Sequence, residues 1–192
     1  MPTLLIVIAS TRPGRVGLPV AQWFEQFSRQ HGAFQVQVAD LLVLNLPMMD
    51  EPHHPRFAQY TKPHTKEWSR IVDSSDAVVL VMPEYNYAMT APLKNALDYL
   101  YQEWHYKPVG LVSYGGPSGG MRAAQMVKQV VTTLKMMPIP ESVAIPFVTQ
   151  YLHDGIFEPP DMIQQAAQAM LDELVKWANA LEPLRAAQRQ MR

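Results

Sequence analysis

The sequence predicts an α/β protein with a doubly wound, five-stranded parallel sheet in the order 2-1-3-4-5 and helices on both faces. Short apolar runs rich in β-branched residues alternate along the chain with segments whose apolar residues recur at helical spacing. Five such runs favour this strand order, because the six-stranded dinucleotide-binding fold needs another strand and helix. The 192 residues suit one domain, which we expect over residues 1–183.

Three strands are expected in the first half of the chain. Residues 3–9 form a continuous apolar run, as in a buried strand, and a helix is expected from residue 16 to about residue 29. Residues 34–40 alternate between apolar and polar, which is typical of a half-exposed strand near a sheet edge. A loop rich in proline and histidine over 47–63 and a short helix then lead to a buried strand at 77–81.

The second half supplies two more strands. A helix is expected over 91–104, with Pro92 in its first turn and Thr90 available as its cap. The strand at 108–113 is followed by a glycine-rich turn over 114–120 and by a helix to about residue 135. A short strand over 142–147 and a helix from about residue 161 complete the pattern. The basic tail over 184–192 is expected to fray.

Composition narrows the possible functions. The formal net charge is −1, so the surface has no overall bias toward nucleic acid or anionic membranes. The chain contains no cysteine, which excludes disulfides, iron–sulfur clusters and thiolate catalysis. No apolar run approaches the roughly 18 residues of a membrane span, and the start of the chain lacks a signal-peptide pattern. We therefore expect a cytoplasmic protein.

Three loops at the predicted carboxyl edge of the sheet suggest a ligand site, because open α/β sheets bind ligands there. The first loop, residues 10–17, combines hydroxyls with Arg12 and Arg15 at the start of a helix, which suits a terminal phosphate. It matches neither the Walker motif nor Gly-x-Gly-x-x-Gly. The alternative is a surface turn with solvated arginines.

The second and third loops suit a flat ring. Tyr85 and Tyr87 can border a ring, and Asn86 can hydrogen-bond to its edge. The alternative is that Glu84 caps the next helix and the tyrosines pack within the loop. The glycines of residues 113–120 allow the backbone to approach a planar ligand, although many ordinary strand–helix turns are also glycine-rich. Phosphate at one end and an electron-poor ring at the other are typical of FMN.

The same segments carry a resemblance to a known family. The motifs are I-A-S-T-R-P-G-R at 8–15, P-E-Y-N at 83–86, P-L-K-N-A-L-D at 92–98 and S-Y-G-G at 113–116. They resemble the NADPH-dependent FMN reductase family, which has the flavodoxin-like fold and relatives that reduce quinones, azo compounds and chromate. The resemblance covers residues 1 to about 150. The loop at 47–63 and the final helix lie outside the matching motifs.

The resemblance implies a residue set for FMN. The phosphate would be bound by Ser10, Arg12 and Arg15, with backbone N–H groups from Val16 and Gly17. The isoalloxazine would contact Pro83, Glu84, Tyr85 and Asn86, and its carbonyl edge would meet Ser113, Tyr114, Gly115 and Gly116. No catalytic side chain is predicted, since a flavin carries the redox chemistry itself.

The expected activity is FMN-dependent oxidation of NADPH or NADH, by ping-pong hydride transfer to a flavin, quinone, azo compound or similar small acceptor. Two alternatives stay open: a flavodoxin-type FMN electron carrier, and a non-redox nucleotide-binding module on the same fold. A preference for NADPH requires a basic group for its 2′-phosphate, and Lys94, Lys107 and Arg122 are candidates.

The sequence also carries signals for assembly and for metal binding. The resemblance implies a homodimer or homotetramer, and the helix bearing Tyr101 and Trp104 is expected to help form a homodimer interface, with Met48 and Met49 also candidates for contact. The histidines of the 47–63 loop lie near acidic residues, as in some zinc sites, but they lack the spacing of a helical metal pair. No metal site is predicted.

Overall fold

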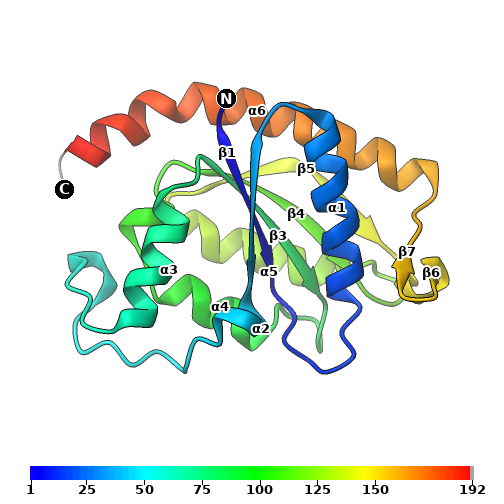
Figure 1. The fold of residues 1–192 in the computed structure, drawn as a ribbon, viewed down its shortest axis with the longest axis horizontal. Helices are drawn as coiled ribbons and strands as arrows, with labels where there is room; N and C mark the ends of the chain where they lie inside the picture. Colours follow the sequence, from blue (N-terminus) through cyan, green and yellow to red (C-terminus); the bar gives the residue numbers. More distant parts are fainter. Residues whose placement is uncertain (191–192) are drawn as a thin grey trace.

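The computed structural model describes residues 1–190, and its centre is a five-stranded parallel sheet (Figure 1). The strand order is β2-β1-β3-β4-β5, which confirms the predicted order. The strands are β1 (Thr3–Ile8), β2 (Gln35–Asp40), β3 (Ala77–Pro83), β4 (Pro108–Tyr114) and β5 (Met137–Ile145). The carboxyl ends of β1, β3 and β4 are therefore neighbours, and the loops that follow them meet at one edge of the sheet.

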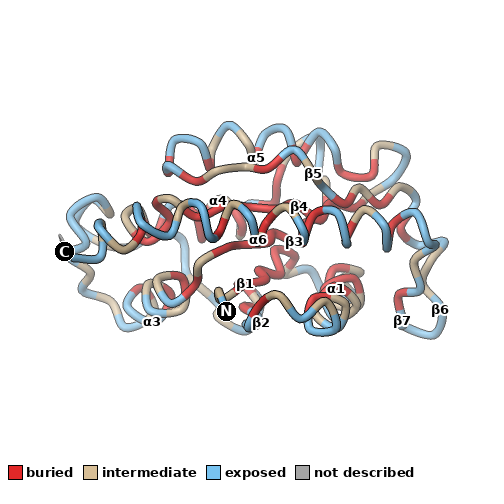
Figure 2. Tube along the Cα trace, turned by 90° about the horizontal axis from the view of Figure 1, so that it is seen from above, coloured by how far each residue is buried: buried red, intermediate tan, exposed pale blue. Residues whose placement is uncertain are grey.

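Helices cover both faces of the sheet. One face packs against α1 (Gly17–His31) and α6 (Asp161–Gln190), and the other against α3 (Pro63–Asp73), α4 (Ala91–Asp98) and α5 (Met121–Thr133). A short helix, α2 (Leu41–Leu44), follows β2 directly. Figure 2 shows buried residues along the strands and on the inner sides of the helices. No helix in the described part of the chain combines the length and apolarity needed to cross a membrane.

The burial of each strand follows its sequence pattern. Every residue of β3 and β4 is buried, as their continuous apolar runs predict for central strands of a parallel sheet. In the edge strand β2 only Ala39 is buried, and the other residues are partly or fully exposed. Thr90 caps α4 by accepting a hydrogen bond from the Leu93 N–H at 3.3 Å, which confirms the predicted start of that helix.

The tail that the sequence predicts to fray is helical over the described residues. Helix α6 continues through Pro183 to Gln190, so the expected boundary at 183 falls inside a helix. Arg185 is 4% exposed and donates to the carbonyls of Ala178 at 2.7 Å and Tyr106 at 3.1 Å. Arg189 donates to the Asp73 carbonyl at 2.9 Å. These bonds anchor the end of the helix to the body of the protein. Residues 191–192 lie outside the described part of the chain.

Other element boundaries also differ from the prediction. Helix α4 ends at Asp98, and the chain then turns through a 3₁₀ helix, η2 (Gln102–Trp104). Trp104 is 1% exposed and donates from its ring to the Leu97 carbonyl at 3.1 Å, so this side chain packs in the core, while the expected homodimer contact of its segment stays a prediction. Strand β5 begins at Met137 rather than at 142, and a small hairpin of β6 (Leu152–His153) and β7 (Ile156–Phe157) follows it.

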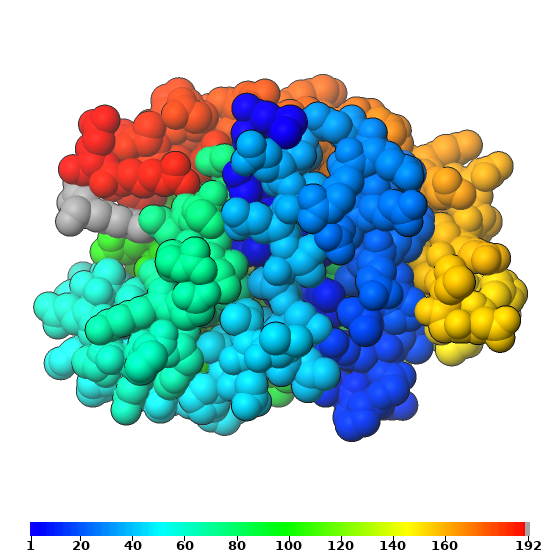
Figure 3. Space-filling model, in the orientation of Figure 1, coloured from blue at the N-terminus to red at the C-terminus, as the bar shows by residue number. Residues whose placement is uncertain are grey.

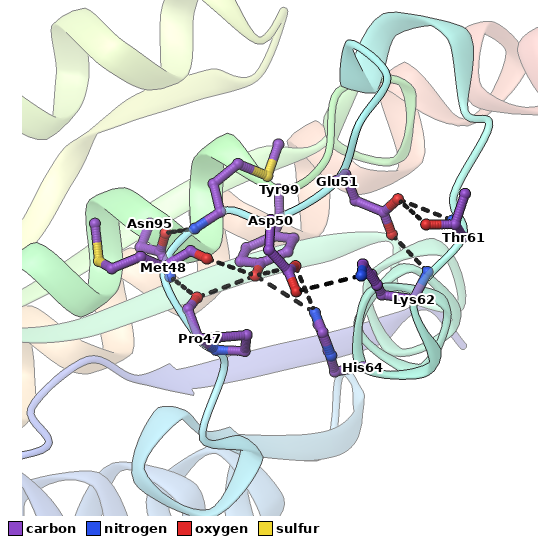
Figure 4. A network of polar contacts seen from close by, with 10 residues as sticks. Pro47, Met48, Asp50, Glu51, Thr61, Lys62, His64, Asn95 and Tyr99 are labelled. Carbon is purple, nitrogen blue, oxygen red and sulfur yellow. Dashed lines mark hydrogen bonds and ion pairs between the residues drawn. The ribbon is translucent and has the colours of Figure 1, made fainter.

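The segment over 47–63 is fastened to the domain by hydrogen bonds (Figure 4). Asn95 donates to the Pro47 carbonyl at 2.7 Å and accepts from the Met49 N–H at 3.0 Å. Tyr99 donates to Asp50 at 3.1 Å, and the same carboxylate lies 2.9 Å from the His64 ring. Within the described residues no group of three or more histidine or acidic side chains is placed to hold a metal ion.

Candidate functional site at the carboxyl edge of the sheet

The three loops meet at the carboxyl edge of the sheet (Figure 1), and hydrogen bonds join them. The first loop follows β1, and its Ala9 carbonyl accepts a hydrogen bond from Thr90 at 3.0 Å. Ser10 and Tyr85 bring the first and second loops together, with 3.4 Å between their hydroxyl oxygens. The Glu84 N–H donates to the Tyr114 carbonyl at 3.1 Å and links the second loop to the third.

The first loop ends at an uncapped helix N-terminus. Val16 precedes α1 and makes no side-chain capping bond, and the first turn of α1 carries no acidic residue. The end of this helix therefore presents backbone N–H groups and partial positive charge. Gly17 leaves no room for a side chain, because a Cβ there would lie 2.4 Å from the Tyr114 hydroxyl oxygen. These features suit an anion held close to the backbone.

A buried hydroxyl points to the same place. The Tyr114 hydroxyl lies beside Ser10 and Gly17 and has no well-formed hydrogen-bond partner among the described residues. Burial raises the pKa of Tyr114 above its ordinary value, so the hydroxyl stays protonated and can donate. Ser10 is itself 1% exposed. Two hydroxyls therefore lie at the start of α1.

The two arginines of the first loop differ. Arg15 pairs with Asp40 through both terminal nitrogens, one of them at 2.5 Å, and also donates to the Ser10 carbonyl at 2.7 Å. Burial raises the pKa of Asp40, but the hydrogen bonds from Arg15 and from the Leu42 N–H outweigh it and hold that pKa below its usual range. Arg12 is exposed. Arg15 is thus bonded within the protein, whereas Arg12 faces the solvent.

The second loop is a tight turn with an unusual backbone. Tyr85 and Ala88 exchange two backbone hydrogen bonds, at 3.0 and 2.9 Å. The two residues between them have positive φ, 51° at Asn86 and 70° at Tyr87, as in a type I′ turn. Positive φ is uncommon for a bulky residue such as tyrosine, and such strain often marks functional turns. Tyr85 and Tyr87 are 39% and 69% exposed.

Glu84 joins this turn to the third loop and does not cap α4. Its carboxylate accepts hydrogen bonds from Ser118 at 3.1 Å and from the Arg122 side chain at 2.7 Å. Partial burial raises the pKa of Glu84, but these bonds outweigh it and hold the pKa below its ordinary value. The Arg122 guanidinium also lies over the Tyr87 ring, 3.9 Å from its centroid. The second and third loops are thus linked by charge and by a cation–π contact.

Much of the third loop is occupied by its own hydrogen bonds. Ser113 is buried and donates to the Gly119 carbonyl at 2.8 Å. The Gly115 N–H donates to the Ile145 carbonyl at 3.2 Å. Gly116 is exposed, and a Cβ added to it would meet nothing within 4 Å. Its carbonyl accepts from the N–H groups of Gly119 at 3.1 Å and Phe147 at 3.0 Å, so its own N–H is the backbone group left without a partner among the described residues.

The structure therefore brings the predicted residues to one edge of the sheet, where some of them are exposed and others are buried. The outer group consists of Arg12, Tyr85, Asn86 and Gly116, which are partly or fully exposed. The inner group, which includes Ser10, Pro83, Ser113 and Tyr114, lies beneath it and is buried. Sequence reasoning missed Asp40 and Ser118. Asp40 was open to detection, because the carboxyl end of β2 adjoins that of β1.

A cavity of about 300 Å³ opens beside the first loop. In Figure 3 the first loop and the segment after β2 lie side by side at the lower edge of the molecule. The cavity is lined by Thr11, Leu41, Leu42, Asn45, Leu46, Met48, Ala91, Pro92 and Asn95. Leucine, methionine and proline predominate in this lining, with two asparagine side chains. It is therefore a hollow of mixed polar and apolar lining next to the polar edge.

Comparison with known proteins gives a consistent result. The model of the NADPH-dependent FMN reductase family matches residues 2–150. An NAD(P)H-dependent FMN reductase of Nectria sp. is 31% identical over 195 residues, which cover 96% of this chain and 97% of the relative. One from Schizosaccharomyces pombe is 37% identical and covers 82% of this chain and 80% of the relative. An NADPH azoreductase of Bacillus sp. is 29% identical, with 74% and 75% covered.

The fold also has solved counterparts. The structure of a flavoenzyme NAD(P)H:(acceptor) oxidoreductase from Paracoccus denitrificans superposes with a TM-score of 0.74. The superposition covers 94% of this chain and 98% of that one, at 20% sequence identity. At this level of identity the likeness concerns the fold.

Proposed function

This chain belongs to the NADPH-dependent FMN reductase family, and from that premise we propose how its carboxyl edge binds FMN and receives its substrates. Membership makes the chain an oxidoreductase that uses FMN and NAD(P)H. The matched relatives are named as reductases, which favours this activity over the electron carrier and the non-redox binding module. The finer assignments below are proposals.

The phosphate of FMN is proposed to bind at the start of α1. The uncapped helix end supplies the N–H groups of Val16 and Gly17, and Ser10 and Tyr114 supply hydroxyls. Arg12 is exposed and able to form a charge-assisted bond with the phosphate. Arg15 is reassigned from phosphate ligand to positioning residue, because its guanidinium is bonded to Asp40 and to the Ser10 carbonyl.

The ring of FMN is proposed to lie against the second and third loops. Pro83 is buried and would lie beneath the ring. Tyr85 offers the face of an exposed aromatic ring, and Asn86 offers an exposed amide. Gly116 offers exposed backbone to the carbonyl edge of the ring. Glu84, Ser113 and Gly115 act within the protein and hold these loops in register. This arrangement keeps the outer face of the site open to a second ligand.

The observation that carries the proposal is the pairing of an uncapped helix end with a strained aromatic turn on adjacent strands. When bound, FMN supplies the redox chemistry, by accepting a hydride from NAD(P)H and passing electrons to an acceptor. The protein side chains position both molecules, and no side chain is required as acid or base. An open ring face suits small planar acceptors such as quinones, azo compounds and flavins, with donor and acceptor binding in turn.

Colour and bleaching test this proposal. The purified protein, alone or after addition of FMN, should be yellow. Under anaerobic conditions NADPH or NADH should bleach this colour rapidly, on the time scale of catalytic turnover. Double-reciprocal plots of initial rate against NAD(P)H concentration, at several acceptor concentrations, should give parallel lines if the order is ping-pong. A yellow protein that neither nucleotide bleaches would favour the carrier. A colourless protein that does not bind added FMN would favour the non-redox module.

A homodimer is also proposed, and its support is exposed apolar surface near the site. Leu42, Val43 and Met48 are 46%, 79% and 75% exposed, and two of them line the cavity of about 300 Å³. Exposed apolar clusters of this kind commonly mark subunit contacts. A cytoplasmic location stays a prediction from the sequence.

Light scattering at micromolar concentration measures the assembly. The wild-type protein should have the mass of a dimer, and V43D should shift it toward the monomer by placing a carboxylate in the contact. I156D, at a position that is 62% exposed on the β6–β7 hairpin, is the matched control and should stay dimeric. A monomeric wild-type protein would contradict the proposed dimer.

A further inference from the structure

The choice between NADPH and NADH depends on a single chemical group. The two nucleotides differ only in the 2′-phosphate of the adenosine ribose, and an arginine is the usual protein group that accommodates it. A suitable residue must lie at the carboxyl edge, where the donor meets the flavin, and must present an available cation. Three basic residues are candidates from the sequence: Lys94, Lys107 and Arg122.

The structure removes Lys107 from this set. Lys107 is 2% exposed and lies just before β4, at the amino edge of the sheet, away from the three loops. Its ammonium group donates to the Val72 carbonyl and, at 3.2 Å, to the Ser75 hydroxyl. A group enclosed in this way cannot contact a nucleotide at the opposite edge.

Lys94 is a weaker candidate than Arg122. Lys94 lies on α4 and contacts both carboxylate oxygens of Asp98, at 2.8 and 2.6 Å. Asp98 follows it by one helical turn and pairs with its ammonium group, as Glu84 pairs with Arg122. A lysine also lacks the planar fork that binds phosphate with two parallel hydrogen bonds.

Arg122 has the required position and orientation. It lies in the first turn of α5, directly after the glycine-rich loop, and is 44% exposed. Its Nε donates to Glu84, and its plane lies 3.9 Å from the Tyr87 ring centroid. These two contacts fix the guanidinium, and among the described residues neither of its two terminal nitrogens forms a hydrogen bond. The Glu84 carboxylate also accepts a hydrogen bond from the Arg122 backbone N–H at 3.0 Å and so caps the N-terminus of α5.

We infer that Arg122, held by Glu84 and Tyr87, binds the 2′-phosphate of NADPH and gives this chain its preference for NADPH over NADH. The inference rests on the proposed function, since it assigns a specificity role within the same site. The fixed guanidinium matters because a group already held in place loses little side-chain entropy when it binds a phosphate.

Binding of oxidised nucleotides to the FMN-loaded protein tests this role without turnover. Isothermal titration with NADP⁺ and NAD⁺ should give tighter binding of NADP⁺ to the wild-type protein. In R122Q the affinity for NADP⁺ should fall roughly tenfold or more, as expected for loss of a charged hydrogen bond, while the affinity for NAD⁺ changes less than about twofold. R122K should retain part of the preference, because it keeps the charge but loses the fork.

Controls separate specificity from loop structure. R70Q removes a surface arginine that pairs with Glu67 on α3, and it should leave both nucleotide affinities unchanged. Kinetics should agree, with the KM for NADPH rising in R122Q far more than the KM for NADH. A wild-type protein without preference for NADP⁺, an R122Q variant that keeps the preference, or equal losses for both nucleotides would contradict the inference. Failure of the proposed function is seen separately, in the bleaching experiment on the wild-type protein.

Discussion

The amino and carboxyl edges of the sheet both carry basic side chains, but they use them differently. At the amino edge Lys107 and Arg185 are 2% and 4% exposed, and they donate to backbone carbonyls near the end of α3 and around α6. At the carboxyl edge Arg12 is exposed and Arg122 is 44% exposed. At the amino edge the cations hold segments of the protein together, whereas at the carboxyl edge they remain accessible to a ligand.

Arg15 shows that the carboxyl edge contains cations bonded within the protein as well as exposed ones. It lies three residues from Arg12 in the same loop, yet its side chain is 8% exposed and pairs with Asp40. The inner residues of this edge are bonded to one another and fix the loops, while the outer residues remain exposed. A ligand site of this kind needs both groups: a rigid inner layer and an accessible outer one.

We expect the largest effects from substitutions that distinguish the buried inner residues of this edge from its exposed outer residues. R15A leaves the Asp40 carboxylate, 15% exposed, without its partner, and should lower the free energy of unfolding by about 3 kcal/mol. R12A should leave the stability of the apoprotein unchanged and weaken FMN binding by about 1.5–3 kcal/mol, roughly 10- to 150-fold. Thermal unfolding and quenching of FMN fluorescence measure the two quantities. Unchanged FMN binding in R12A would remove the phosphate assignment of Arg12.

The amino edge should respond to pH through Lys107. Burial lowers the pKa of Lys107 from 10.5 to about 7, so between these values the unfolded chain holds a proton that the folded lysine has released. Stability should therefore rise with pH across this window, by about 2 kcal/mol between about pH 7.5 and 9.5. Urea unfolding of wild type and K107M measures the difference. An equal slope in K107M would show that another group causes it.

Alanine substitutions at two glycines of the carboxyl edge should differ in their cost to stability, by a smaller amount. A Cβ at Gly17 would lie 2.4 Å from the Tyr114 hydroxyl oxygen, so G17A should cost about 1–2 kcal/mol of stability and also weaken FMN binding. Y114F in the same background should restore most of the stability by removing that oxygen. G116A is the matched control, since its Cβ meets nothing within 4 Å. Equal losses in G17A and G116A would show that contact with Tyr114 is not the cause.

The strand order and the edge at which the three loops meet were predictable from the sequence, and the details of bonding were not. The apolar runs of β3 and β4 and the helix start at Thr90 follow directly from local patterns. The commitment of Arg15 to Asp40 depends on a contact across 25 positions, which no local pattern reveals. The order of the tail likewise depends on Arg185, whose distant backbone partner is the Tyr106 carbonyl. Local signals thus predict elements and edges, whereas long-range pairs decide which side chains remain available.

A crystal structure of the protein with FMN tests the central claim most directly. We predict that the phosphate lies at the first turn of α1, near Ser10 and Gly17, and that the ring lies against Tyr85 and Gly116, with Arg15 still paired to Asp40. Density for FMN elsewhere on the protein, or a phosphate bound by Arg15 after its separation from Asp40, would contradict the assignment of inner and outer residues at this edge.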